Sequence, residues 1–180
     1  QLGSKGTFSG KLTMNGHGYP FRGTFNSSGF VRLPVLRKNL VPVVLAMTVN
    51  LPGPPHEIHG TVTDGTWLSD LFAQKTVPAA AGAVGSRTFA LLQTGSVEIG
   101  SGTSKIASSG SVTFRGVFDA KKYSSSSGLS EIGDSPFYLS LKGGTEALIG
   151  RVILIDLSAP RGELVWVKSA TNEIITVVPK

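Results

Sequence analysis

The sequence predicts an all-β protein, an antiparallel meander that closes into a barrel or a two-sheet sandwich of roughly 11–14 strands. Apolar and polar residues alternate with a period of two along most of the chain, which is the pattern of strands with one buried face. Turn residues rich in glycine, asparagine and serine separate these stretches. No stretch of about twelve residues has the spacing of an amphipathic helix.

The first third is predicted to be a three-stranded meander over residues 6–33. In Thr7–Met14 and in Tyr19–Phe25, the aromatic, aliphatic and glycine residues share one face and most polar residues share the other. Asn15-Gly16 favours a type I′ hairpin turn, because both central residues of that turn need a positive φ. Residues 26–29 (Asn-Ser-Ser-Gly) provide the second turn.

The remaining strands are predicted from the same alternation and from the turn residues between them. A proline-rich break at 52–55 ends the fourth strand. The residues of Ala147–Ile155 are apolar on both faces, which predicts a strand buried on both sides. Trp67–Thr76 also suits a short helix, but we favour a strand, and Lys121–Ser130 is a polar strand or loop. In order, the predicted strands are Pro42–Leu51, Glu57–Thr63, Trp67–Thr76, Thr88–Leu92, Val97–Ile106, Ser111–Phe118, Lys121–Ser130, Phe137–Leu141, Ala147–Ile155, Glu163–Lys168 and Ile174–Val178.

The chain is predicted to form a single domain, residues 1–180, made of two meander halves. Residues 77–84 (Val-Pro-Ala-Ala-Ala-Gly-Ala-Val) differ in composition, and we interpret them as a linker between the halves 1–76 and 85–180. A triplet Phe-x-Gly occurs on both sides of this linker. In a strand it sets a bare glycine beside a phenylalanine on one face, where a neighbouring ring can lie across the glycine. We favour this packing role over an aromatic ligand platform for the triplets Phe8-Ser9-Gly10, Phe21-Arg22-Gly23 and Phe114-Arg115-Gly116.

Composition excludes several classes of protein. The 180 residues include no cysteine, which excludes a disulfide scaffold, a thiol nucleophile and a zinc ribbon. No apolar run reaches about 18 residues, so we expect no membrane span. Hydrophobic residues make up 40 % of the chain, enough to bury a core, which argues against wholesale disorder.

The positive charge is concentrated in the first third of the chain. The net charge is +6. Residues 1–56 carry all of it, because they contain six basic residues and no acidic one, whereas residues 57–180 contain 11 of each. Such a face suits an anionic polysaccharide or an acidic protein surface. Nucleic acid is disfavoured, because the aromatic residues of the first hairpin fall on the face opposite its basic residues. The candidate basic contact face consists of Lys5, Lys11, Arg22, Arg32, Arg37 and Lys38.

No motif indicates catalysis or metal binding. His56-Glu57-Ile58-His59 is not the His-Glu-x-x-His zinc motif, and strand residues three apart point to opposite faces. Neither a Gly-x-Ser-x-Gly elbow nor a phosphate loop occurs. We interpret Glu57, Asp64 and Asp70 as solvated strand ends, not as the carboxylate pair of a glycosidase. We therefore expect no enzymatic activity, no catalytic residue, no metal and no cofactor.

Several stretches, in order along most of the chain, resemble a known kind of module. They are 6–13 (Gly-Thr-Phe-Ser-Gly-Lys-Leu-Thr) with 19–29 (Tyr-Pro-Phe-Arg-Gly-Thr-Phe-Asn-Ser-Ser-Gly), 110–119, and 135–144 with 148–150. Together they are similar to a β-rich module found near the ends of large secreted bacterial surface proteins. Residues 121–134 depart from that pattern, because a serine-rich stretch replaces a turn of the Asp-Gly-Thr type. The resemblance implies an exported, non-enzymatic part of a larger assembly, secreted or at the cell surface.

Three functional hypotheses follow from the sequence. The first is a structural or adhesive module that contacts other protein copies or neighbouring domains, including self-assembly into a fibre or layer. In that case Gly3–Met14 and Asn172–Pro179 would pair edge to edge with another copy. The second is a carbohydrate-binding module with Trp67, Tyr123, Tyr138 and Trp166 as exposed contact aromatics. The third and weakest is a glycan-acting hydrolase, which needs two carboxylates in a deep polar cleft.

Overall fold

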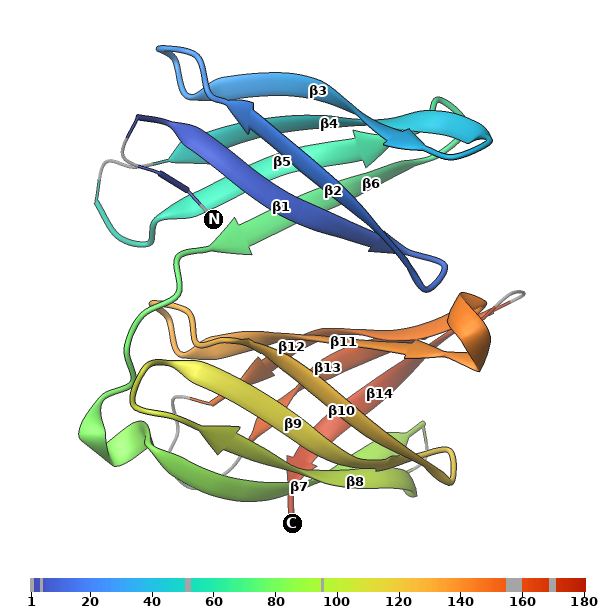
Figure 1. Cartoon of the computed structure of the whole chain (residues 1–180). Helices are drawn as coiled ribbons and strands as arrows, with labels where there is room; N and C mark the ends of the chain where they lie inside the picture. The colour runs from blue at the N-terminus through green and yellow to red at the C-terminus, as the bar shows by residue number, and fades with distance from the viewer. Residues whose placement is uncertain (1, 4, 51–52, 95, 155–159, 169–170) are drawn as a thin grey trace. The chain divides into compact units, whose positions relative to one another are not determined.

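The computed structural model describes residues 2–3, 5–50, 53–94, 96–154, 160–168 and 171–180. Over these residues the chain is nearly all β-structure and its sheets are antiparallel, so the predicted fold class is confirmed (Figure 1). Two short 3₁₀ helices, η1 (Ala81–Ala83) and η2 (Lys142–Gly144), accompany the strands. None of the described helices is long and apolar enough to cross a membrane.

The chain separates into two compact units, Gln1–Lys75 and Thr76–Lys180. That these units form one domain stays a prediction. The strands of the first unit are β1 (Thr7–Met14), β2 (His17–Thr24), β3 (Phe30–Arg37), β4 (Leu40–Asn50), β5 (Glu57–Thr63) and β6 (Leu68–Gln74). Those of the second are β7 (Gly85–Gln93), β8 (Val97–Ile106), β9 (Ser111–Phe118), β10 (Lys121–Gly128), β11 (Asp134–Leu141), β12 (Glu146–Ile153), β13 (Arg161–Val167) and β14 (Asn172–Pro179).

In the first unit the β1–β2 hairpin packs on a separate sheet of order β3-β4-β5-β6. The predicted hairpin turn is confirmed, with φ of 49° at Asn15 and 75° at Gly16. The predicted three-stranded meander is wrong, because β3 pairs with β4 and not with β2. Asn26 explains the change of sheet: its Oδ1 accepts hydrogen bonds from the backbone N–H groups of Ser28 and Phe30 and holds a tight turn between β2 and β3.

The expected packing of rings over glycines is confirmed in this hairpin. Phe8 pairs with Gly23 across the two strands, and Gly10 pairs with Phe21. A Cβ atom on Gly23 would lie 2.6 Å from Cζ of Phe8, and one on Gly10 would lie 2.5 Å from Cζ of Phe21. Each ring therefore lies across the glycine of the facing strand, on the side that joins the core with Val43, Leu45 and Met47 of β4.

In the second unit eight strands form a nearly closed barrel of order β10-β9-β8-β7-β14-β13-β12-β11. Side chains join its two end strands: Ser125 Oγ donates to the carbonyl oxygen of Tyr138 at 2.7 Å, and the hydroxyls of Ser127 and Ser135 lie 2.6 Å apart. The serine-rich stretch thus supplies small polar side chains that bridge the two end strands, β10 and β11, between which no backbone ladder is described. Inside, Phe114 stacks edge-on against Phe89 and Phe137.

One prediction about a strand of this unit is wrong, and a second applies to fewer residues than expected. β12 is not buried on both sides, because Ile149 and Ile153 are 38 % and 46 % exposed while Leu148 and Val152 are buried. Ile155 lies outside the described residues. β14 is not a free edge strand: it pairs with β13 over Asn172–Val177 and with β7 over Thr176–Pro179, so the edge of Thr176–Pro179 that faces β7 is already used. Thr176–Pro179 therefore has no free edge toward β7 for another copy, and edge-to-edge pairing through the rest of Asn172–Pro179 stays a prediction.

The segment 77–84 does not behave as a free linker. The N–H of Val77 donates to the carbonyl of Leu129 at 2.9 Å, and that of Ala79 donates to the carbonyl of Ser108 at 3.1 Å. These bonds attach the segment to the second unit, whose boundary with the first falls between Lys75 and Thr76.

Candidate binding faces

The six basic residues predicted as one contact face lie on different parts of the first unit. Lys5 precedes β1, Arg32 lies on β3 in the other sheet, and Lys38 lies in the turn after β3; all three are exposed. Arg37 is withdrawn from any contact face. Its Nη2 lies 3.1 Å from Oδ2 of Asp64, and its Nε donates to the carbonyl of Val41 at 2.8 Å.

Lys11 and Arg22 do share the outer face of the β1–β2 hairpin, as the alternation predicts. Register places Ser9 opposite Arg22 and Thr7 opposite Thr24. We call Thr7, Ser9, Lys11, Arg22 and Thr24 the hairpin face. In the part of the chain that the structure describes, Lys11 and Arg22 have no ion-pair or hydrogen-bond partner, in contrast to Arg37.

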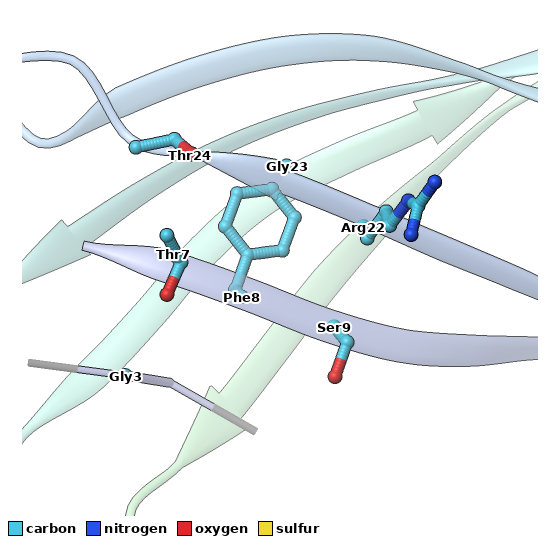
Figure 2. A pocket seen from close by; sticks show the side chains of 7 residues that line it. All are labelled: Gly3, Thr7, Phe8, Ser9, Arg22, Gly23 and Thr24. Atoms are coloured by element: carbon cyan, nitrogen blue, oxygen red, sulfur yellow. The ribbon is translucent and has the colours of Figure 1, made fainter. Parts of the chain in front are cut away.

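An open hollow of about 550 Å³ lies at the hairpin face. Figure 2 shows Thr7, Phe8 and Ser9 of β1 beside Arg22 and Thr24 of β2, with the Phe8 ring between the strands next to Gly23. Gly3 completes the lining. Lys11 is not among the lining residues: its aliphatic stem lies across Gly18, on the side of the hairpin turn, where a Cβ atom would lie 2.8 Å from Cδ of Lys11.

The second unit has a similar face that sequence reasoning missed. A hollow of about 370 Å³ is lined by Ser86, Thr103, Lys105, Ala107, Ser111, Thr113 and Arg115. We call Ser86, Thr103, Lys105, Thr113 and Arg115, which come from β7, β8 and β9, the barrel face. Lys105 and Arg115 have no partner among the described residues. The signal that could have found them is the Phe-x-Gly triplet, because Arg115 is the middle residue of the third one.

Among the described residues of the second unit, two carboxylates are buried, and both are held by cations. Asp134 accepts a hydrogen bond from Nη2 of Arg151 at 2.6 Å and another from Ser130. Glu146 lies 2.6 Å from Nζ of Lys142 and accepts a hydrogen bond from Trp166. A hydrogen bond from the Lys142 ammonium group holds the pKa of Glu146 below its ordinary value. Burial opposes this lowering, and the hydrogen bond from Trp166 adds to it.

These carboxylates are also far from each other. Asp134 begins β11, and Glu146 pairs with Leu141 at its other end. Seven residue steps along a strand span about 23 Å, whereas a glycosidase needs its two carboxyl groups within about 10 Å. The acids singled out in the sequence are likewise spread along the β5–β6 hairpin: Asp64 lies in its turn with Arg37, Asp70 on exposed β6, and Glu57 at the far end.

His59, from the His-Glu-Ile-His stretch, stacks on Phe72 with ring centroids 4.9 Å apart. Its Nε2 lies 2.7 Å from Oε2 of Glu57. Among the described residues, no group of three or more histidine, aspartate or glutamate side chains could hold a metal ion.

Of the four aromatic residues predicted to contact a glycan, only Tyr138 is exposed, at 37 %. Tyr123 and Trp166 are buried in the barrel core, so the prediction is wrong for both. The cause is strand parity: each falls on an inward position of its strand, where Tyr123 stacks on Phe137 and Trp166 stacks on Phe118. Trp67 is half-buried against the core of the first unit.

No model of a known protein family matches the chain, and no curated protein does. Among solved structures, the chain is similar to a protein of unknown function from the DUF3598 family of Nostoc punctiforme. The two share 10 % sequence identity and align with a TM-score of 0.37, over 98 % of this chain and 83 % of the other. The function proposed below therefore depends on the residues of this chain alone.

Proposed function

We propose that this chain is a non-enzymatic adhesive module that holds an anionic polysaccharide on its hairpin face. The observation that carries the proposal is Arg22, an exposed cation without a partner among the described residues, which lines an open hollow with the hydroxyl residues Thr7 and Thr24. Lys11, a second such cation, projects from the same face of the hairpin. An unpaired exposed cation costs nothing to leave in water, but it attracts and orients an anion that approaches it.

The chemistry of the face favours a sugar polymer over a nucleic acid. Thr7 and Thr24 each offer a hydroxyl that both donates and accepts hydrogen bonds, which suits the hydroxyl groups of a polysaccharide. Arg22 can bind a carboxylate or sulfate group through two parallel N–H donors. Single-stranded nucleic acids are usually held by stacking on exposed aromatic rings, whereas Phe8 is buried and Phe21 joins the core.

Two further observations support a role through contacts instead of turnover. The barrel core is filled by packed aromatic and aliphatic side chains. The buried carboxylates Asp134 and Glu146 are engaged by Arg151 and Lys142, which is the arrangement of structural ion pairs. Export to the cell surface, and contacts with other copies or neighbouring domains, remain expectations drawn from the family resemblance.

Affinity chromatography tests the proposal. On a dextran sulfate resin the protein should bind at low salt and elute as salt screens the charges, and it should pass through a resin of unmodified dextran. The variant K11Q/R22Q should elute at distinctly lower salt. The control R32Q/K38Q removes the same charge from exposed residues outside the hairpin face and should elute close to the wild type. Equal retention on both resins, or equal shifts for the two variants, would refute the proposal.

A further inference from the structure

We infer that the barrel face is a second anion-binding site, built on the same strand register as the hairpin face and suited to the same class of acidic polysaccharide. This inference rests on the proposed function and extends it from one site per chain to two, one in each compact unit.

The two faces share one local arrangement. In the hairpin, Lys11 pairs with Pro20, and Arg22 stands two residues farther along that strand, opposite Ser9. In the barrel, Lys105 pairs with Thr113, and Arg115 stands two residues farther along, opposite Thr103. In both cases a lysine and an arginine are diagonal neighbours on adjacent antiparallel strands, with Cα atoms about 7–8 Å apart. Each arginine faces a hydroxyl residue that precedes the lysine by two positions.

The sequence around each arginine explains why it points outward. Phe21-Arg22-Gly23-Thr24-Phe25 and Phe114-Arg115-Gly116-Val117-Phe118 both have the form Phe-Arg-Gly-x-Phe. Phe25, Phe114 and Phe118 are buried, and Phe21 packs against the core of its unit. Because side chains alternate across a strand, an arginine between two inward positions must project from the outer face.

Lys105 and Arg115 are unpaired among the described residues of the second unit, and unlike the unpaired Lys121 and Lys122 they line the hollow. Four other cations of this unit are paired with carboxylates: Lys142 with Glu146, Arg151 with Asp134, Lys168 with Glu173 and Lys180 with Glu98. The lining of the hollow contains no carboxylate, but it contains four hydroxyl side chains from three adjacent strands. The positive charge there is therefore uncompensated, and a sulfate or carboxylate group would neutralise it.

The hollow favours an acidic sugar over a nucleic acid for the same reason as the hairpin face. Its lining residues are serine, threonine, lysine, alanine and arginine, so it offers no aromatic ring on which a base could stack.

Isothermal titration calorimetry on the full chain with a short sulfated dextran oligosaccharide tests the inference. The wild type should bind two equivalents of the sulfated oligosaccharide and should not bind the unsulfated oligosaccharide. K105Q/R115Q and K11Q/R22Q should each bind one equivalent, and the four-fold variant none. R32Q/K38Q should keep two. The substituted side chains face solvent, so the variants should retain the wild-type urea midpoint; R115Q alone, with weakened binding of one equivalent, serves if the double variant unfolds.

The outcomes separate the two proposals. The second site would be overturned if K105Q/R115Q still bound two equivalents. It would also be overturned if the wild type bound a single equivalent that K11Q/R22Q loses. Either result would leave the proposed function standing. No binding by the wild type would overturn both. Tighter binding of a single-stranded oligonucleotide of equal charge to the barrel face would overturn the assignment of the ligand class.

Discussion

Replacing Gly23 by alanine should destabilise the first unit clearly, whereas the same change at Gly10 should be nearly neutral. Both glycines lie under an aromatic ring of the same hairpin, and neither has a positive φ that would forbid alanine. The two substitutions therefore differ only in how freely the covering ring can move. This makes them a matched pair for testing whether the ring-over-glycine packing holds the hairpin.

The magnitude follows from the crowding at each site. A Cβ atom on Gly23 would lie 2.6 Å from Cζ of Phe8, about 0.8 Å closer than the 3.4 Å at which ordinary contact begins. Phe8 is only 8 % exposed and packs on Phe25 with ring centroids 4.7 Å apart, so it cannot turn away freely. Overpacking of this kind costs about 1–3 kcal/mol. Alanine returns about 0.4–1 kcal/mol by restricting the unfolded chain, which leaves a net loss of about 1–2 kcal/mol.

At Gly10 the crowding is similar, with Cζ of Phe21 only 2.5 Å away, but the ring of Phe21 is half-buried and can swing toward solvent. The entropic gain then offsets most of the strain. The chain has one tryptophan in each unit, so in a W166F background the fluorescence of Trp67 reports unfolding of the first unit in urea. G10A costing as much as G23A, or more, would refute the packing argument.

Two further predictions concern single side chains. The hydroxyl of Tyr123 is buried with no hydrogen-bond partner in the described part of the chain, and burial raises its pKa above the ordinary value. Y123F should therefore stabilise the second unit by about 1 kcal/mol, seen as a higher urea midpoint; a lower midpoint would mean that the hydroxyl is bonded after all. Hydrogen bonds from Thr66 and Arg37 lower the pKa of Asp64 from 3.8 to about 2. Because the folded pKa is the lower one, this stabilisation is present above about pH 4 and is lost as the pH falls to about 2. D64A should thus melt below the wild type at pH 7 by circular dichroism, with a gap that closes near pH 2; a gap of constant size would contradict this.

The positions of the strands could be predicted from the sequence, but many of their partners could not. The predicted bounds of Glu57–Thr63, Val97–Ile106 and Ser111–Phe118 coincide with β5, β8 and β9, because the alternation of side chains is a local property of each strand. Pairing depends instead on contacts between distant residues. The link between β14 and β7, for example, joins Thr176 to Leu92, and no local pattern distinguishes that arrangement from a free terminal strand.

The candidate faces show the same division. Alternation placed Lys11 and Arg22 correctly on an outer face, but counting charge along the sequence also included Arg37, whose partner Asp64 comes 27 residues later. The same counting hid Lys105 and Arg115. They lie in a part of the chain, residues 57–180, whose basic and acidic residues are equal in number, whereas in the fold Asp134 and Glu146 pair with other cations.

The Phe-x-Gly triplets connect the core of each unit to its outer face. In the β1–β2 hairpin, the first and third residues of two triplets pack against each other, Phe8 over Gly23 and Phe21 over Gly10. The middle residues, Ser9 and Arg22, are then directly opposite each other on the outside, because register fixes all three positions at once. A packing motif on one side of the hairpin is therefore sufficient to set the spacing of a hydroxyl and a cation on the other. The triplet in β9 packs differently from the predicted ring over glycine, because a Cβ atom on Gly116 would meet the backbone oxygen of Ser101, and there the strand register alone places Arg115 opposite Thr103.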